Sequence, residues 1–400
     1  MKEKAKCLLK LIFLTLAFSS LYAYASNNIQ EKILRSLENF AKNHRIQATY
    51  IISQGENVLV SGAQGYSDLL RNQRLPKHQM MPVLSISKQV TAAGILVLRD
   101  RNLLNLHDNL AKYSNAFKNL WSENNKPKWL EKITIHNLLL HTSGIEDYIG
   151  KFPIAQSNTK KDFESSLGGV LLKHPPQITP DSVHLYNNTN YYLLGLLIEE
   201  ISGMKLSDFF QKEFFDPLGM ENTYLLSFTE AFEIQQKPRL SNFPIRYFLT
   251  PTENSPKFSP VPRQILLVPG GDCGLVSNAK DLIIWNRGLH NGKILSKTSY
   301  QKMIKPYHRI IDKRNGYSSY IGYGMYISIL HNGKKYYHYD TGGYGVRCDT
   351  GYIPKYDLTL AILSNVAFNI PNDMASKVDF RRPENQIDIA YLRDAMLEAL

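Results

Sequence analysis

Cysteine is scarce in this chain of 400 residues, which contains three. Cys7 lies in the N-terminal leader described below, so only Cys273 and Cys348 remain in the rest of the chain. A bridge between them would close a loop of about 75 residues and stabilise the fold by roughly 4 kcal/mol on a chain-entropy model. Two cysteines in an oxidising compartment can pair, and two buried thiols are the alternative. The sequence leaves both open.

Several signatures of other enzyme classes are also missing. No Gly-x-Ser-x-Gly elbow is present, so an α/β-hydrolase triad lacks support. None of the eleven histidines stands in a His-Glu-x-x-His or similar ligand spacing, which argues against a zinc site. Nucleotide-binding glycine loops are absent as well. We therefore expect no metal and no organic cofactor, and a catalytic base other than histidine.

Long hydrophobic runs are lacking too. The N-terminus carries four lysines, then the apolar run Leu11–Phe18, then Ala23-Tyr24-Ala25. This is the pattern of a secretory signal peptide, residues 1–25, with cleavage after Ala25. No later segment reaches the roughly 18 continuous apolar residues of a membrane span. We therefore predict a periplasmic or secreted domain of residues 26–400 without a membrane span.

Acidic residues are fewer than basic ones, 35 against 47. Loss of the leader, with its four lysines and one glutamate, lowers the formal net charge from +12 to +9. The basic residues are scattered without a long run, so nucleic acid is not expected as a partner. We instead expect peripheral contact with an anionic envelope surface or cell-wall polymer, which salt would weaken.

The apolar content of 43% is ample for a packed core, and the patterns of the chain indicate how it is organised. Residues 47–64 read as two short strands around a Gly-Glu-Asn turn. The stretch 85–235 is mainly helical, and residues 238–269 carry seven prolines and little periodicity. We interpret that proline-rich segment as a long irregular loop, a lid or wall over a cleft.

The C-terminal part is β-rich after a helix near 279–290. The segments "GYGMYISIL", "KKYYHYD", "GVRCDTGYI" and "LTLAILSNV" are separated by turn residues, as in an antiparallel meander, and a last helix is expected over 385–400. We predict an α/β (α+β) fold with one antiparallel sheet from about 45–66 and 320–368. Helices flank this sheet, and a mostly helical region is inserted into it.

The most informative local feature is Ser85 followed by Lys88 in "MPVLSISKQVTAAGILVLRD". On a helix this spacing puts a hydroxyl and an amine on nearly the same face, so a neutral lysine could take the serine proton. The bare spacing is weak evidence, because it recurs at Ser157/Lys160, Ser202/Lys205, Ser277/Lys280 and Ser299/Lys302.

Helix context separates the first pair from the others. Pro82 precedes it, and the stretch that follows Ser85 is apolar nearly all round, as in a buried helix. Lys88 would then lie in the first turn, where desolvation and the positive helix end disfavour the ammonium form. The alternative is a helix start with a snorkelling lysine.

Tyrosine is the natural second partner of a serine nucleophile beside its lysine, because a phenolate between cations can pass a proton from the serine to a leaving group. Two Tyr-x-Asn triplets exist: "YSN" from Tyr113 to Asn115 and "YNN" from Tyr186 to Asn188. Both residue types are also common in turns. The residues alone do not choose between the two triplets.

Five stretches together resemble the class C β-lactamase and penicillin-binding serine hydrolase family in order and spacing. They are "SISKQVTAAGILVLRDRNLLNLHDNLAKY", "ITIHNLLLHTSGIEDY", "VHLYNNTNYYLLGLLIEEISG", "DPLGMENTYL" and "GGDCGLVSNAKDLIIWNRGL". The match spans about residues 45 to 370. This resemblance implies a β-lactamase/transpeptidase-like fold, a Ser85 nucleophile and its Lys88. It also selects Tyr186 and Asn188, because the family's Tyr-x-Asn motif follows the His-Thr-Ser-Gly helix.

The family's third motif, Lys-Thr-Gly or His-x-Gly, should fall on Asp340, Thr341 and Gly342 in "YDTGGYG". By carry-over from the family, the backbone N–H groups of Ser85 and Gly343 would form the oxyanion hole.

Asp340 departs from the family, whose members place a cation or a histidine there to hold a substrate carboxylate. An aspartate would repel that carboxylate by roughly 1 to 4 kcal/mol at surface-like dielectric. Three outcomes follow: the substrate is neutral or cationic at this point, Arg347 or His338 holds the carboxylate in place of the missing cation, or the carboxylate binds elsewhere. His338 lies on the same strand face as Asp340, which allows an Asp/His pair. The alternative is a solvated turn residue in a shifted register.

We therefore expect acyl transfer through a Ser85 acyl-enzyme, handled by Lys88 and Tyr186 and completed by water. The expected substrate is a small molecule or a peptidoglycan-derived peptide: a cell-wall D-amino-acid peptide, as for a carboxypeptidase, or an ester. A class C type β-lactamase is one alternative. The other is a non-catalytic relative that binds peptidoglycan fragments or a protein partner.

Overall fold

The computed structural model describes residues 28–39, 47–152, 157, 159–236, 242–250, 257–262, 268–311, 317–368 and 389–398. The signal peptide and cleavage site predicted above lie outside the described residues.

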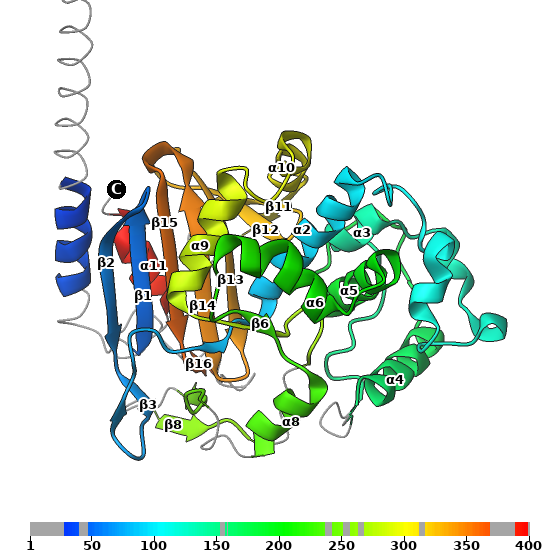
Figure 1. The fold of residues 1–400 in the computed structure, drawn as a ribbon, viewed down its shortest axis with the longest axis horizontal. Helices are drawn as coiled ribbons and strands as arrows, with labels where there is room; N and C mark the ends of the chain where they lie inside the picture. Colours follow the sequence, from blue (N-terminus) through cyan, green and yellow to red (C-terminus); the bar gives the residue numbers. More distant parts are fainter. Residues whose placement is uncertain are drawn as a thin grey trace, which may run out of the picture.

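An eight-stranded antiparallel sheet, in the order β10-β11-β12-β13-β14-β15-β1-β2, forms one part of the molecule, and a helical region lies beside it (Figure 1). Its strands are β1 Ala48–Gln54, β2 Asn57–Gln64, β10 His308–Ile311, β11 Ser318–Gly322, β12 Met325–Ile329, β13 Lys335–Gly343, β14 Val346–Ile353 and β15 Leu358–Ser364. The short strands outside this sheet are β3 Tyr66–Asp68, β4 Gln73–Arg74, β5 Met81–Pro82, β6 Tyr224–Leu225, β7 Tyr247–Thr250, β8 Lys257–Pro260, β9 Leu275–Ser277 and β16 Val366–Phe368.

The helices lie mainly between β5 and β10. They are α2 Ser87–Asp100, α3 Ile135–Leu139, α4 Lys160–Lys173, α5 Asn188–Ser202, α6 Leu206–Phe210, α7 Asp216–Leu218, α8 Phe228–Gln236, α9 Ala279–His290, α10 Lys297–Met303 and the C-terminal α11 Ile389–Glu398. A further helix covers residues 28–39. In the part of the chain that the structure describes, no helix is both long and apolar enough to cross a bilayer.

The period-two pattern of β1 explains why the sheet is covered on both faces. Ile51 packs into the large core that includes α2 and α9, whereas its neighbour Ile52 packs with Ile33 and Leu392 on the other face. Ile33 belongs to helix 28–39 and Leu392 to α11, and both helices lie on the side of the sheet away from α9 (Figure 1). The central sheet is therefore buried between two helical layers.

The predicted sheet assembled from both ends of the chain is confirmed. β1 pairs antiparallel with β15, so residues near positions 50 and 360 lie side by side, and β1 turns into β2 through Gly55 and Glu56. The helix expected near 279–290 is α9. Asn278 caps it, because the Asn278 side chain accepts from the Asp281 N–H at 2.9 Å. The α/β architecture with an inserted helical region thus follows the sequence pattern.

The proline-rich segment 238–269 is more regular than predicted. Its strands β7 and β8 pair with each other, and β7 pairs in parallel with β16. Residues 238–241, 251–256 and 263–267 lie outside the described residues. Arg246 Nη1 donates to the Tyr344 carbonyl at 3.0 Å, which ties the segment to the turn after β13. The prediction of an irregular loop is therefore wrong for β7 and β8, and its role as a lid stays a prediction.

Both remaining cysteines are free and buried, so the bridge considered above does not form. The Cys348 thiol donates to the Pro82 carbonyl at 3.7 Å, and the Cys273 thiol donates to the Val268 carbonyl at 3.3 Å. Each sulfur has its own backbone partner in the core, which is the buried-thiol alternative.

Candidate active site

Ser85 lies in the short 3-10 turn Leu84–Ile86 that leads into α2. Leu84 adopts a left-handed φ of 46° just before it. Ser87 fixes this turn, since its hydroxyl donates to the Leu84 carbonyl at 2.6 Å and accepts from the Leu275 N–H at 3.0 Å. The prediction of a helix buried nearly all round is confirmed, because α2 is buried from Ser87 through Leu98. Its buried sides anchor the turn that presents Ser85.

Lys88 is fully buried one turn further along α2. Its Nζ donates to Ser85 Oγ at 2.9 Å, to Asn188 Oδ1 at 2.9 Å and to the Asp272 carbonyl at 2.8 Å. Three acceptors match the three N–H groups of an ammonium, whereas a neutral amine has only two.

The charge state of Lys88 differs from the sequence prediction. Burial opposes the ammonium form, but the nearby Tyr186 hydroxyl and Asp272 carboxyl outweigh it and raise the pKa of Lys88 above its usual value. The prediction that desolvation holds this lysine neutral is therefore wrong. Its partners compensate the charge that burial penalises.

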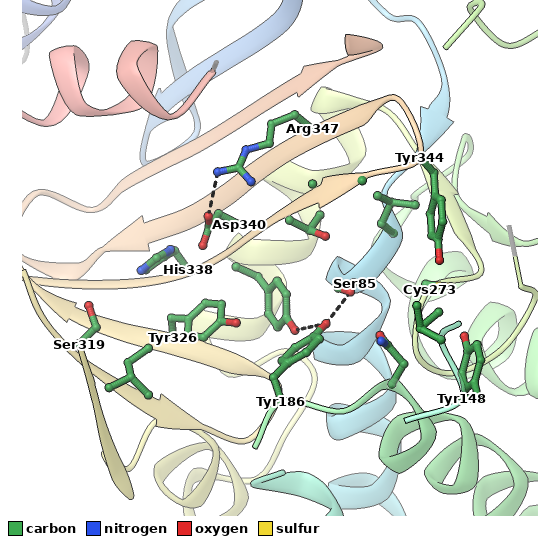
Figure 2. A pocket seen from close by; sticks show the side chains of 18 residues that line it. Ser85, Tyr148, Tyr186, Cys273, Ser319, Tyr326, His338, Asp340, Tyr344 and Arg347 are labelled. Atoms are coloured by element: carbon green, nitrogen blue, oxygen red, sulfur yellow. Dashed lines mark hydrogen bonds and ion pairs between the residues drawn. The ribbon is translucent and has the colours of Figure 1, made fainter. Parts of the chain in front are cut away.

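Tyr186, just before α5, places its hydroxyl 2.7 Å from Ser85 Oγ (Figure 2). Ser85 Oγ accepts from Lys88 and has the Tyr186 hydroxyl as its second partner, and either hydroxyl can be the donor of that bond. The Tyr339 hydroxyl donates to the same Tyr186 oxygen at 3.4 Å, and Lys88 Nζ lies 5.0 Å from the Tyr186 ring centre. Tyr186 thus lies between the nucleophile, the Tyr339 hydroxyl and the Lys88 side chain.

Asn188 begins α5 and faces Lys88 in a fixed orientation. Its Nδ2 donates to Asp147 Oδ2 at 3.0 Å, which turns Oδ1 toward the lysine. The other triplet is not part of this arrangement, because the Tyr113 hydroxyl donates to Asp108 Oδ2 at 2.6 Å. Tertiary contacts therefore bring Ser85 together with the second Tyr-x-Asn triplet, as the family resemblance implies.

The third motif lies on β13, beside the serine. By strand alternation, Thr341 shares the sheet face of Tyr339, and Asp340 points to the other face. Asp340 Oδ2 forms an ion pair with Arg347 Nη2 at 3.3 Å, and their side chains are 11% and 15% exposed. The alternative of a solvated turn residue is therefore wrong. A Cβ at Gly342 would lie 2.7 Å from Arg347 Nη1, so glycine lets the arginine cross the strand.

His338 is the other residue that the sequence offered as a partner of Asp340. Its Nε2 forms a hydrogen bond with Ser328 Oγ at 2.8 Å. Asp340 therefore has Arg347 as its cationic partner across the β13–β14 pair. Together the two side chains add no net charge to the motif.

A cavity of about 640 Å³ opens over Ser85. Figure 2 shows Tyr148 and Tyr344 on one side of Ser85, and Tyr326 and His338 on the other. The residues that line it are Leu84, Ser85, Tyr148, Ile149, Tyr186, Asn188, Cys273, Ile310, Ser319, Tyr326, His338, Tyr339, Asp340, Thr341, Gly342, Gly343, Tyr344 and Arg347. A cavity of this size, walled by tyrosines and by polar side chains, has room for a small organic molecule.

Three contacts of this site were not predicted. The Asp272 carbonyl holds Lys88, its carboxylate accepts from the Tyr148 hydroxyl at 2.6 Å, and Tyr339 reaches Tyr186. Burial raises the pKa of Asp272. In the sequence, the glycine pair before Asp272 could have indicated that this segment packs closely against another element. A Cβ at Gly271 would lie 2.6 Å from the Tyr191 carbonyl, so only glycine allows this close approach to α5.

No group of three or more histidine, cysteine or acidic side chains forms a metal-binding arrangement within the described ranges. The arrangement found is a serine, an ammonium, a tyrosine and an amide joined by hydrogen bonds.

Comparisons with known proteins agree with this geometry. The family model described as Beta-lactamase matches residues 33–377. Penicillin-binding protein 4* of Bacillus subtilis is 25% identical over 306 residues, which cover 74% of this chain and 63% of that protein. The chain therefore spans less than two thirds of that relative's length.

Solved structures share the fold at lower identity. D-amino acid amidase from Ochrobactrum anthropi SV3 has a TM-score of 0.71 at 17% identity, covering 93% of this chain and 98% of that one. The octameric penicillin-binding protein homologue from Pyrococcus abyssi has a TM-score of 0.66 at 23% identity, covering 85% and 73%. With the family model matched over most of its length, the chain belongs to the β-lactamase family of serine hydrolases.

Proposed function

We propose that this protein hydrolyses an amide or ester through an acyl-enzyme on Ser85. The observation that carries the proposal is the hydrogen-bonded cluster at the base of the cavity, in which Ser85 Oγ is 2.9 Å from Lys88 Nζ and 2.7 Å from the Tyr186 hydroxyl. A nucleophile within hydrogen-bonding reach of its base, with that base oriented by a third group, is the arrangement that nucleophilic catalysis requires.

In the proposed mechanism Tyr186 is the base and Lys88 its permanent counter-charge. Tyr186, acting as a phenolate with the Lys88 ammonium as counter-charge, takes the Ser85 proton as Ser85 Oγ bonds to the substrate carbonyl carbon and so becomes a neutral phenol. The N–H groups of Ser85 and Gly343 would hold the oxyanion. Tyr186 then protonates the leaving amine or alcohol as its bond to carbon breaks. Water then attacks the acyl carbon as the same tyrosine takes its proton, and the tyrosine passes that proton to Ser85 Oγ as the ester bond breaks, which releases the acid and restores Ser85.

The substrate we propose is a D-amino-acid amide, a D-amino-acid peptide of the cell wall, or an ester. Similarity to a penicillin-binding protein and to a D-amino acid amidase supports this class. The Asp340–Arg347 pair favours members without a free carboxylate at the third motif, since the cation there is already neutralised. We therefore expect amides and esters to react faster than the matching peptides that end in a carboxylate.

Covalent labelling tests this proposal. A fluorophosphonate or a fluorescent penicillin should add its mass to the wild-type protein at Ser85, and Ser85→Ala should abolish the label. Ser299→Ala is a matched control, because Ser299 belongs to another Ser-x-x-Lys spacing, on α10. Labelling that persists in Ser85→Ala contradicts the assignment, and a folded wild-type protein that takes no label supports the non-catalytic alternative.

Nitrocefin separates the remaining activities. Efficient steady turnover would favour a β-lactamase, whereas a burst of one equivalent followed by slow turnover would favour a penicillin-binding enzyme. We propose the second outcome, because Asp340 pairs with the Arg347 cation at the third motif and so weakens its attraction for the carboxylate of a β-lactam. Export to the envelope belongs to the same proposal, and a mature N-terminus beginning at Ser26 would support it.

A further inference from the structure

His141 holds an unusual position next to the proposed base. It follows α3 in the stretch "HTSG" and adopts a left-handed backbone with φ 58°, which is uncommon for a residue other than glycine. Its side chain is 5% exposed and does not line the cavity over Ser85. A buried, backbone-strained histidine near a catalytic group is a position where strain can serve function.

His141 contacts three consecutive residues around Tyr186. Its carbonyl accepts from the Leu185 N–H at 2.9 Å, and its Nδ1 accepts from the Asn187 N–H at 3.1 Å. Between these two bonds, the His141 and Tyr186 rings lie 4.7 Å apart, tilted by 37°. One residue therefore holds the backbone on both sides of Tyr186 and packs against its ring.

These contacts need the neutral imidazole. Nδ1 must be an acceptor, so the ring proton is on Nε2, and a second proton would break the bond from Asn187. Burial, the Lys88 ammonium and His184 lower the pKa of His141 well below its usual value. Four titratable groups surround the ring: Lys88 from α2, His184 and Tyr186 from the segment before α5, and Tyr191 within α5.

We propose that His141 is the positioning residue that fixes Tyr186 within reach of Ser85. This inference rests on the proposed function, because it assigns Tyr186 the role of base. The bond to Asn187 fixes the chain direction at Tyr186, and the ring contact limits where the tyrosine hydroxyl can go. A misplacement of about 1 Å at the reacting groups can lower a rate by roughly 10²-fold, so losing this support should act on acylation more than on binding.

Three substitutions separate the two contacts. His141→Asn tolerates the left-handed backbone and keeps a side-chain acceptor for the Asn187 N–H. His141→Gly also accepts that backbone but has neither acceptor nor ring. His141→Phe keeps a ring against Tyr186 without the acceptor. The control is His184→Asn. The His184 ring lies 5.8 Å from the His141 ring, but it is His141 that accepts from the Asn187 N–H.

The measurement is the rate at which a fluorophosphonate phosphonylates Ser85 with loss of fluoride, followed by intact mass at several probe concentrations. His141→Gly and His141→Phe should lower the maximal rate roughly 10²-fold, with the half-saturating concentration within about threefold of wild type. His141→Asn should lose less than about tenfold, and His184→Asn should stay within about threefold. A purely structural role would lower the melting temperature without this split between rate and saturation.

The proposal is overturned if His141→Asn loses as much as His141→Gly, or if both react like wild type. If the glycine variant does not fold, His141→Asn is compared with His141→Phe instead. The proposal is then overturned if these two variants lose equally, or if both react like wild type. A wild-type protein that takes no label at Ser85 overturns the proposed function together with this inference. Labelled wild type with unaffected variants overturns this inference alone.

Discussion

Replacing Tyr186 with phenylalanine removes a single oxygen, the one that lies 2.7 Å from Ser85 Oγ. Lys88 keeps its acceptors on Ser85, Asn188 and Asp272, so the nucleophile stays in place while its proton acceptor is lost. A positioned general base contributes about 10² to 10⁴ in rate, which corresponds to roughly 2.7 to 5.4 kcal/mol of barrier. The acylation rate of Tyr186→Phe should fall by that factor.

Stability should change little in this variant. Tyr186 is 40% exposed, so the change removes little buried surface and no fully buried hydrogen bond. A fall in acylation with an unchanged melting temperature would therefore report on chemistry and not on folding.

The matched control is Tyr113→Phe, the same substitution in the other Tyr-x-Asn triplet. The Tyr113 hydroxyl bonds to Asp108 Oδ2 at 2.6 Å, so this variant should lose about 1 kcal/mol of stability or less and no activity. Fluorophosphonate labelling followed by intact mass gives both rates, and differential scanning fluorimetry gives both melting temperatures. The reasoning is refuted if Tyr186→Phe reacts within tenfold of wild type, or if Tyr113→Phe loses as much as Tyr186→Phe.

Three further outcomes follow from charges in the structure. Lys88 should stay an ammonium between about pH 7 and pH 10 in ¹³C-lysine NMR, because its pKa is raised from 10.5. The Lys88 signal is assigned as the one that disappears in Lys88→Met, and a titration of that signal near neutral pH would contradict the prediction. Asp340→Asn removes a negative charge beside Arg347, so KM for peptides ending in a carboxylate should fall about tenfold relative to their amides, and equal KM changes for both would refute the electrostatic role. Burial lowers the pKa of His290 to about 3, whereas the unfolded chain binds that proton near pH 6.5, so stability is lost as pH falls below 6.5. By pH 4.5 the loss from this group should reach about 2 to 3 kcal/mol in urea unfolding, and His290→Phe should remove that part of the decline, failing which the assignment is wrong.

Much of the fold could be predicted because its cause is local. The two short strands predicted around the turn in 47–64 and the helix predicted near 279–290 depend on residues within a few positions of each other, and the structure has β1, β2 and α9 there. The segment containing β7 and β8 was misjudged because its pairing partner, β16, comes more than a hundred residues later. Prolines mark turns and sheet edges, but they say nothing about a distant partner strand.

For the site, the sequence by itself determined which residue types are available: the Ser85/Lys88 spacing, two Tyr-x-Asn triplets and a third motif with an aspartate. Only the tertiary structure decided how they act, because pKa and hydrogen bonding depend on groups brought together from separate elements. The Asp272 carbonyl supplies the third acceptor of Lys88, and Arg347 reaches Asp340 from the next strand. From the sequence, only the helix position and burial of Lys88 could be considered, and they predict a neutral amine. The groups that raise its pKa, Tyr186 and Asp272, lie far from it along the chain.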